Sequence, residues 1–259
     1  MGEEILFDVR GDGIAWLTFN RPAARNAMTL GMYARLEEVC KGAARHPSVR
    51  VLLLRGAGDK AFVAGTDISE FRNFSNAEDG IAYEASMSRV LDVLEELPIP
   101  TIAVLQGACT GGGAAIAAAC DLRIGDPSAR FGFPIARTLG NTLSTRNLAR
   151  LAALLGVAKT KELLFLARLM NAEEMRAAGL LSEIVPAEGL HARAEAMAAT
   201  LLEHAPITLR TCKSELGRVL RSAAPPEGEA HVIEAYTSDD FKEGVDSFLV
   251  KRTPHWRGQ

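Results

Sequence analysis

Short apolar runs alternate with helix-like segments through the first half of the chain, and this alternation limits the fold more than any other feature. Apolar strands are predicted at residues 49–54, 99–105 and 122–124. Between them, residues 82–97 carry an apolar stripe at helical spacing, and residues 111–119 are typical of a second helix. Strands that alternate with helices in this way predict an α/β core.

The segments around this core follow simpler patterns. Residues 5–9 and 14–19 flank a Gly-Asp-Gly turn and predict a β-hairpin. A helix is expected from about Thr29 to Ala44, with Thr29 as its N-cap. The second half is predicted to be helical apart from a short strand at 183–185, with a linker-like spot only at Pro225-Pro226. Its predicted helices are 144–155, 159–168, 172–178, 190–204, 207–221, 227–237 and 239–250.

Charge and composition exclude two classes of protein. The 259 residues contain 29 Lys+Arg and 32 Asp+Glu, a net charge of −3, which argues against a nucleic-acid binder. The longest uncharged stretch, residues 97–120, contains Pro98, Pro100 and Gln106 and divides into a strand, a turn and a helix, so we reject a membrane span.

The cysteines point to a reducing compartment. None of the four cysteines stands in C-x-x-C spacing, and the chain opens on Glu3 and Glu4 rather than on a secretory signal. We therefore expect free thiols, no metal site and a cytoplasmic protein. The five histidines lie in segments interpreted as helix ends or surface, so none is a candidate ligand.

Two glycine-containing loops are the candidates for chemistry. Ala64-Gly65-Thr66-Asp67 follows one strand, and Gly111-Gly112-Gly113 follows another and opens a helix. A helix N-terminus offers unpaired N–H groups, and two such groups from separate loops would form an oxyanion hole. The alternative is that Gly65 serves only a turn and the triple glycine only permits close packing.

The order of the motifs resembles that of the crotonase family, also called the enoyl-CoA hydratase/isomerase superfamily. The resemblance covers nearly the whole chain. It rests on Asn20-Arg21-Pro22, Asn26-Ala27-Met28, residues 60–67, Gln106-Gly107, Gly111-Gly112-Gly113, Cys120-Asp121, Phe131-Gly132-Phe133-Pro134, Ala177-Ala178-Gly179-Leu180, residues 239–244, Phe248 and Lys251-Arg252.

The resemblance implies a fold and an assembly. It implies an α/β spiral of ββα units over residues 1–190, followed by a helical C-terminal trimerisation region over residues 191–259. It also implies a homotrimer or a hexamer built as a dimer of trimers.

The resemblance further implies a ligand and its contacts. The ligand is an acyl-CoA thioester, bound without any other cofactor, whose enolate the amides of Thr66 and Gly112 stabilise. CoA contacts would fall on Arg25, Ala27, Ala64, Ile68, Phe248 and Lys251. For Lys251 a plain surface role stays open beside a phosphate contact.

The chain departs from the family at its catalytic positions. Ala115 stands where hydratases place the first of two glutamates, and Ile135, or Ala136 if the gap is moved, stands at the position of the second. Thr142 stands where related dehalogenases place an aspartate. The paired carboxylates that add and remove water are therefore absent. Two hypotheses follow: an enoyl-CoA hydratase/isomerase-type enzyme of the lyase or isomerase class, or a CoA-thioester-binding protein without hydratase turnover.

Other polar residues lie in segments that could line the acyl pocket. Arg137 and Asn141 are candidates, with a surface ion pair as the alternative for Arg137. Glu70, Tyr83 and Glu84 lie near a region that supplies catalytic groups in some relatives, but we expect exposed helix residues at all three. Asp67 is expected to hold its own loop by accepting backbone N–H bonds.

Overall fold

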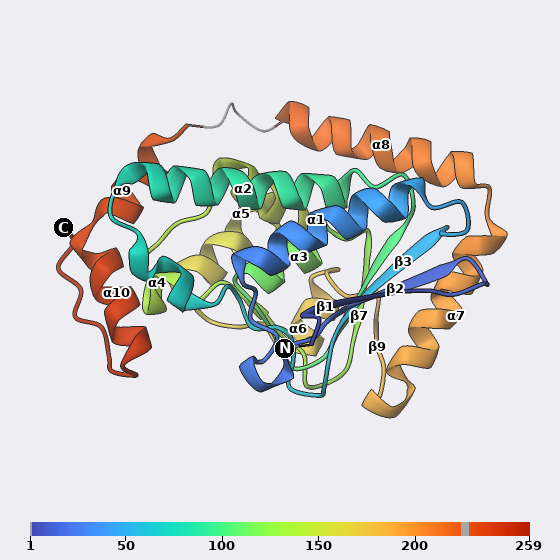
Figure 1. Ribbon diagram of the computed structural model, residues 1–259, viewed down its shortest axis with the longest axis horizontal. Coiled ribbons are helices and arrows are strands. Elements are labelled where there is room, and N and C mark those ends of the chain that lie inside the picture. The colour runs from blue at the N-terminus through green and yellow to red at the C-terminus, as the bar shows by residue number, and fades with distance from the viewer. Residues whose placement is uncertain (1, 224–227) are drawn as a thin grey trace.

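A six-stranded sheet forms the centre of the computed structural model, which describes residues 2–223 and 228–259 (Figure 1). β1 pairs antiparallel with β2, and every other neighbouring pair is parallel. The predicted hairpin and the predicted strands are confirmed. In sheet order, the strands are β1 (Ile5–Val9), β2 (Ile14–Phe19), β3 (Val51–Gly56), β5 (Thr101–Leu105), β7 (Leu122–Gly125) and β9 (Glu183–Ile184).

A second, parallel sheet of three short strands was not expected. It consists of β4 (Ala61–Val63), β6 (Ala108–Thr110) and β8 (Arg130–Gly132). Three-residue strands are too short for an alternating pattern to reveal them. Along the chain, a strand of the large sheet is followed by a strand of the small sheet and then by a helix. This order occurs as β3, β4 and α2 (Ala77–Glu95), and again as β5, β6 and α3 (Gly112–Ala119). This succession is the expected spiral of ββα units.

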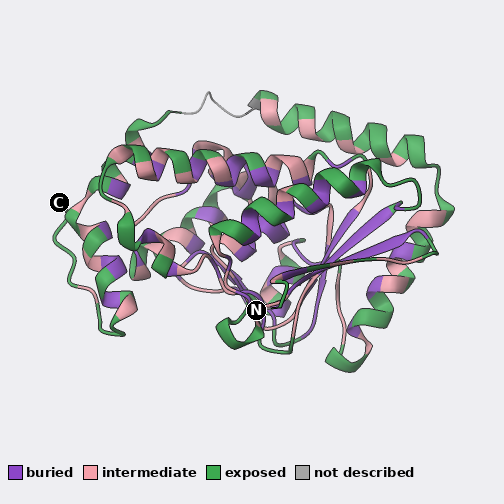
Figure 2. Ribbon diagram, in the orientation of Figure 1, coloured by how far each residue is buried: buried purple, intermediate pink, exposed green. Residues whose placement is uncertain are grey.

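Side chains of each central strand alternate between two apolar layers. Leu52 and Leu54 face α1 (Leu30–Arg45), α2 and α3, while Val51 and Leu53 face α7 (Leu190–Glu203). Both faces of the sheet are covered, so the central strands are buried along most of their length (Figure 2). They are mainly apolar, as is typical of buried parallel strands. α7 therefore packs directly on the sheet. The predicted boundary near residue 190, between the spiral core and the helical C-terminal region, stays a prediction.

The remaining helices match the predicted pattern with small shifts. Thr29 caps α1 through its side chain, as expected. α2 begins earlier than predicted because Asn76 and Asp79 form a capping box. Residues 145–165 contain two helical stretches separated at Gly156, where φ is 74°. The other helices are η1 (Pro22–Ala24), η2 (Ile68–Asn73), α4 (Ile135–Thr138), α5 (Thr145–Phe165), α6 (Ala172–Ala177), η3 (Ala187–Gly189), α8 (Pro206–Ala223), α9 (Ala230–Thr237) and α10 (Asp239–Leu249).

The end of the chain folds back over the first spiral turn. α9 packs against α2, and α10 packs against η2, at the end of the molecule opposite α7 (Figure 1). Phe71, Tyr236 and Phe241 form a small apolar cluster there. The predicted linker at Pro225-Pro226 lies outside the described residues. Among the described helices, none is both long and apolar enough to cross a lipid bilayer.

Candidate active site

The two glycine loops meet in space. Gly65 and Gly111 both have positive φ, 104° and 53°, a conformation that glycine adopts without steric cost. A Cβ atom built on Gly111 would lie 3.6 Å from the Cα of Gly65, so the loops are in van der Waals contact. Met28 fixes the first loop: its N–H donates to the Gly65 carbonyl (2.9 Å), and its carbonyl accepts from Asp67 N–H (2.8 Å).

Both loops leave amides without a protein partner: within the described residues, no acceptor is found for the N–H groups of Gly65 and Thr66 on the first loop or of Gly112 and Gly113 on the second. Within residues 2–223 and 228–259, neither Thr66 N–H nor Gly112 N–H has a hydrogen-bond acceptor. Gly112 is the first residue of α3, where no intrahelical acceptor exists and the helix dipole favours negative charge. Both residues line the same cavity. The loops thus bring together two free donors suited to an oxyanion.

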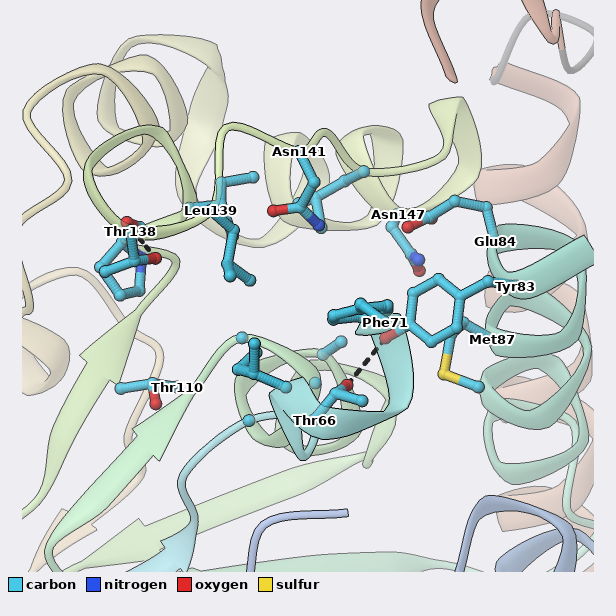
Figure 3. Close-up of a pocket in the computed structure, with 18 of the residues that line it drawn as sticks. Thr66, Phe71, Tyr83, Glu84, Met87, Thr110, Thr138, Leu139, Asn141 and Asn147 are labelled. Carbon is cyan, nitrogen blue, oxygen red and sulfur yellow. Dashed lines mark hydrogen bonds between the residues drawn. The ribbon is translucent and has the colours of Figure 1, made fainter. Parts of the chain in front are cut away.

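The cavity beside these amides is mainly apolar and measures about 190 Å³. Figure 3 shows it between Thr66 on one side and Asn141 and Asn147 across from it, with Tyr83, Glu84 and Met87 entering from α2. No arginine, lysine or histidine is found among the described residues that line it, and Glu84 is the acidic one. Its apolar wall consists of Ile68, Phe71, Met87, Leu91, Ala115, Pro134, Ile135, Leu139, Leu143 and Phe248.

Three hydroxyl groups join α1 and α2 to the first glycine loop. The Thr66 hydroxyl lies 2.9 Å from the Tyr33 hydroxyl. It also lies 2.7 Å from the Tyr83 hydroxyl (Figure 3). Burial raises the pKa of Tyr33 to about 12 and raises the pKa of Tyr83 well above 10. Both phenols therefore stay protonated near neutral pH, and in each pair either hydroxyl can be the donor. The expectation that Tyr83 is an exposed helix residue is wrong.

Glu84 belongs to a buried polar network on the far side of the cavity. It is 5% exposed; one carboxylate oxygen accepts from the Tyr236 hydroxyl (2.7 Å) and the other from Ser144 N–H (2.8 Å). Asn141 donates its NH₂ group to the Tyr236 hydroxyl (3.1 Å). The expectation of an exposed Glu84 is therefore wrong, because α9 covers this part of α2.

The sequence-predicted pocket residues divide into two groups. Asn141, Ala64, Ile68 and Phe248 line the cavity with Thr66 and Gly112, and so do Ala115 and Ile135, at the positions of the two missing glutamates. Arg137 is exposed on α4 and is not part of the lining. Glu70 is half-buried, accepts weakly from Leu30 N–H (3.3 Å) and also lies outside the lining.

The residues predicted to contact CoA lie on three segments that adjoin the cavity. Arg25 is exposed, and its carbonyl accepts from Ala64 N–H (3.1 Å). Lys251 is exposed just beyond α10, and its N–H donates to the Phe248 carbonyl (3.2 Å). Arg25, Ala27 and Lys251 do not line the cavity themselves.

Asp67 holds its loop as expected. Its carboxylate accepts from Ser69 N–H (3.2 Å) and from the Ser69 hydroxyl (2.7 Å), and it also pairs with Arg21 (3.1 Å). These bonds fix the residue next to Thr66, and with it the direction of the Thr66 amide.

Three residues of the site were not predicted from the sequence. Tyr33 precedes Leu36 by three positions on the buried face of α1, so helical spacing could have found it. Asn147 follows the Ser144 N-cap by three positions and gave no signal beyond its polarity. Tyr236 reaches the site from 152 residues beyond Glu84, which no local pattern reports.

The comparisons with known proteins match nearly the whole chain to one family. The family model for enoyl-CoA hydratase/isomerase matches residues 10–259. The short-chain-enoyl-CoA hydratase of Clostridium acetobutylicum is 33% identical over 243 residues, 92% of each chain. A crystal structure of an enoyl-CoA hydratase/carnithine racemase from Magnetospirillum magneticum is 34% identical, has a TM-score of 0.81 and covers 100% of this chain and 97% of that one.

One solved structure is more similar in shape but less similar in sequence. A methylmalonyl-CoA decarboxylase complexed with 2S-carboxypropyl CoA has a TM-score of 0.89 at 26% identity, with 100% of both chains covered. The family match over nearly the whole chain, the identities above 30% and the shared spiral fold lead to one conclusion. The chain belongs to the enoyl-CoA hydratase/isomerase family, the crotonase superfamily.

Proposed function

We propose that this protein is an enzyme that forms and stabilises the enolate of an acyl-CoA thioester. The thioester carbonyl oxygen would lie between the N–H groups of Thr66 and Gly112. The observation that carries this proposal is that unpartnered amides from two neighbouring loops, those of Thr66 and Gly112 among them, lie on residues that line one apolar cavity. Donors fixed in such surroundings stabilise developing negative charge more strongly than water does.

Proton transfer would then fall to groups other than paired glutamates. An enolate forms when a bond at the α-carbon breaks and its electron pair moves toward the thioester oxygen. Either the α-proton passes to a base, for which Glu84 is the carboxylate among the described lining residues, or carbon dioxide departs from a malonyl-type ester. The α-carbon must later gain a proton. The Tyr83 hydroxyl is 2.7 Å from the hydroxyl of Thr66, whose own amide belongs to the oxyanion hole. Tyr83 is therefore the donor we assign to the α-carbon. Ala115 and Ile135 offer no carboxylate for adding water across a double bond.

A second candidate reaction is the decarboxylation of a malonyl-type CoA ester. The similarity in shape to methylmalonyl-CoA decarboxylase, with a TM-score of 0.89, favours it. In that reaction the electron pair of the broken carbon–carbon bond becomes the enolate, so no carboxylate base is needed. The same two amides would stabilise the product.

Residues around the cavity would hold the CoA part. Ile68 and Phe248 line the cavity, and Arg25 accepts through its carbonyl from the N–H of Ala64, which also lines it. We assign Arg25 and Ala27, two residues further on, to the CoA contact. Lys251 follows Phe248 by three residues and has a charge suited to a phosphate. We propose that these residues bind CoA in the cytoplasm and that the reaction needs no further cofactor.

Assembly into a trimer, or into a dimer of trimers, is part of the proposal. α8 carries exposed apolar side chains at Ile207, Leu216 and Val219, and Phe165 and Leu166 are exposed at the end of α5. Leu216 and Val219 are three positions apart and so share one face of α8. Exposed apolar groups that lie together are typical of surfaces that contact another chain.

Hydrogen exchange at the α-carbon tests the proposal. Butyryl-CoA is incubated with the protein in D₂O, and mass spectrometry follows deuterium uptake, while malonyl-, crotonyl- and 3-hydroxybutyryl-CoA are followed for conversion. Enolate formation predicts deuterium uptake or carbon dioxide release. Tight binding of these esters without exchange or conversion would instead support the binding protein without turnover.

A further inference from the structure

Three side-chain hydroxyl groups beside the proposed oxyanion hole form a group that we call the hydroxyl triad: Tyr33, Thr66 and Tyr83. The Thr66 oxygen stands in the middle, 2.9 Å from that of Tyr33 and 2.7 Å from that of Tyr83 (Figure 3). In the described part of the chain, none of the three hydroxyl groups has a hydrogen-bond partner outside the triad. All three residues line the cavity, so a bound ligand is what could complete their hydrogen bonding.

The triad has more protons than its own hydrogen bonds use. Each hydroxyl group has one proton to donate. Because burial raises the pKa of Tyr33 to about 12 and that of Tyr83 well above 10, both phenols keep their protons near neutral pH. Three protons serve two hydrogen bonds. One proton is therefore left for a group in the cavity.

Exposure indicates which hydroxyl group keeps this spare proton. Tyr33 is only 2% exposed, which leaves little room for an acceptor at its end of the triad, whereas Tyr83 is half-buried. A middle hydroxyl that accepts from one neighbour and donates to the other polarises both bonds, which a hydroxyl that accepts twice does not. The favoured direction therefore runs from Tyr33 to Thr66 to Tyr83, with the Tyr83 proton left for the cavity.

Packing holds the two phenol rings in place, so hydrogen bonds decide where this proton points. The Tyr83 ring lies edge-on to Phe71, with 4.9 Å between the ring centroids. Tyr33 belongs to the main apolar core. With the rings held, each phenol proton can turn only about its C–O bond. A hydrogen bond from Thr66 to the Tyr83 oxygen directs the Tyr83 proton away from Thr66 and towards the cavity.

We propose that Tyr33 and the side chain of Thr66 are positioning residues, which direct the Tyr83 proton to the α-carbon of the bound ester. This inference rests on the proposed function, in which Tyr83 protonates that carbon. It gives the Thr66 side chain a role separate from that of the Thr66 amide, which binds the thioester oxygen.

The proton-transfer step balances within the triad. The electron pair of the enolate forms a C–H bond with the Tyr83 proton, and the negative charge passes to the Tyr83 oxygen. Hydrogen bonds to a charged oxygen are stronger than those to a neutral one, so the bond from Thr66 stabilises the phenolate more than the phenol. Tyr33 in turn donates to Thr66 and strengthens that bond. After the product leaves, a proton from water restores the Tyr83 hydroxyl.

Two substitutions at residue 66 test the side-chain role. Thr66→Val keeps the shape and the backbone amide but removes the hydroxyl group, whereas Thr66→Ser keeps that group. Deuterium incorporation in D₂O is followed with butyryl-CoA, or with malonyl-CoA if that is the ester converted. We expect Thr66→Val to be about tenfold slower, the effect of one lost hydrogen bond. Thr66→Ser should stay within about threefold of the wild type, and the Kd for butyryl-CoA should change in neither variant.

A double-mutant cycle tests whether Tyr33 acts through Tyr83. Tyr83→Phe is expected to lower the rate at least about 10²-fold, and Tyr33→Phe severalfold. In the Tyr83→Phe background, Tyr33→Phe should have no further effect, whereas independent structural effects would multiply. Circular dichroism verifies the fold of each variant. This cycle carries the test if Thr66→Val does not fold.

Infrared spectroscopy of the bound carbonyl separates this role from alignment of the oxyanion hole. The carbonyl frequency of bound butyryl-CoA should be the same in Thr66→Val as in the wild type, because the amide is retained. A frequency closer to that of the free ester would show that the hydroxyl group aligns the amides, and would overturn the proposal.

The remaining failures are distinguishable. If the wild type incorporates deuterium from D₂O with no ester, the proposed function fails, and the role of the triad with it. If the wild type does incorporate deuterium but a folded Thr66→Val variant is equally fast, only the positioning role is overturned. The same conclusion follows if Tyr33→Phe slows Tyr83→Phe by the factor by which it slows the wild type.

Discussion

The hydroxyl oxygen of Tyr33 lies so close to the Cα of Gly112 that a Cβ atom on this glycine would overlap it. The same Cβ atom would lie 3.2 Å from the Thr66 hydroxyl oxygen. A side chain at residue 112 is therefore excluded because the hydroxyl groups of Tyr33 and Thr66 occupy the space. The contact ties helix α1, the first glycine loop and the start of α3 into one unit.

Gly112→Ala is expected to displace Tyr33 and Thr66 and to misalign the two amides. Loss of one oxyanion-hole donor typically lowers kcat about 10²–10³-fold, and we expect a decrease near the lower figure in α-proton exchange. The matched control is Gly42→Ala in α1, where a Cβ atom meets nothing within 4 Å. A Gly112→Ala variant that exchanges as fast as the wild type would contradict this role.

The buried tyrosines predict how stability changes at high pH. An unfolded tyrosine loses its proton near pH 10, whereas burial keeps Tyr33 protonated to about pH 12. Stability is therefore complete below pH 10 and decreases as pH rises towards 12, by about 2–3 kcal/mol at most from Tyr33. Tyr83 and Tyr236, whose pKa values burial also raises, contribute in the same direction.

Urea unfolding at several pH values between 8 and 12 measures this dependence. The decrease should be smaller in Tyr33→Phe than in the wild type, after each is referred to its own stability at pH 8. Identical slopes in the two proteins would exclude Tyr33 as a source of the dependence.

Adding the two absent carboxylates should create hydratase activity. Ala115 and Ile135 both line the cavity, so Ala115→Glu with Ile135→Glu places two acids in it. Each positioned acid or base contributes about 10²–10⁴-fold, and crotonyl-CoA hydration should exceed that of the parent. Burial of new charge lowers stability, so folding is verified first by circular dichroism.

The single variants Ala115→Glu and Ile135→Glu serve as controls for this experiment. A folded double variant that binds crotonyl-CoA but hydrates it no faster than the parent would show that the cavity is not arranged like that of a hydratase.

The exposed apolar side chains of α8 predict self-association. Sedimentation at micromolar concentration should give a trimer or hexamer, and Leu216→Glu with Val219→Glu should dissociate it, because both side chains are exposed in the single chain. A stable wild-type monomer would contradict the proposed assembly.

Local patterns in the sequence predicted most of the fold. Thr29 as a helix cap, the first hairpin and the apolar strand at Val51–Gly56 follow from short-range rules of capping, turns and burial. The three-residue strands of the small sheet do not follow from such rules, because their pairing depends on the spiral as a whole.

The candidate site was predicted only in part, for a similar reason. The glycine loops carry their own signal, and Thr66 and Gly112 do line one cavity. Tyr83 and Glu84 were expected to be exposed because nothing near them in sequence indicates that α9 packs over α2. One local feature does indicate this contact. A Cβ atom on Gly80 would lie 2.6 Å from Tyr236, so a glycine within α2 marks the close approach of α9.

The polarisation of a bound thioester carbonyl tests the central claim most directly. Butyryl-CoA labelled with ¹³C at the carbonyl is bound to the protein, and its C=O stretching frequency is measured by isotope-edited infrared spectroscopy. Two amide donors at the oxygen predict a shift to lower wavenumber relative to the free ester, and Gly112→Ala should reduce that shift. A bound ester whose carbonyl frequency equals that of the free ester in water, in both proteins, would contradict the account.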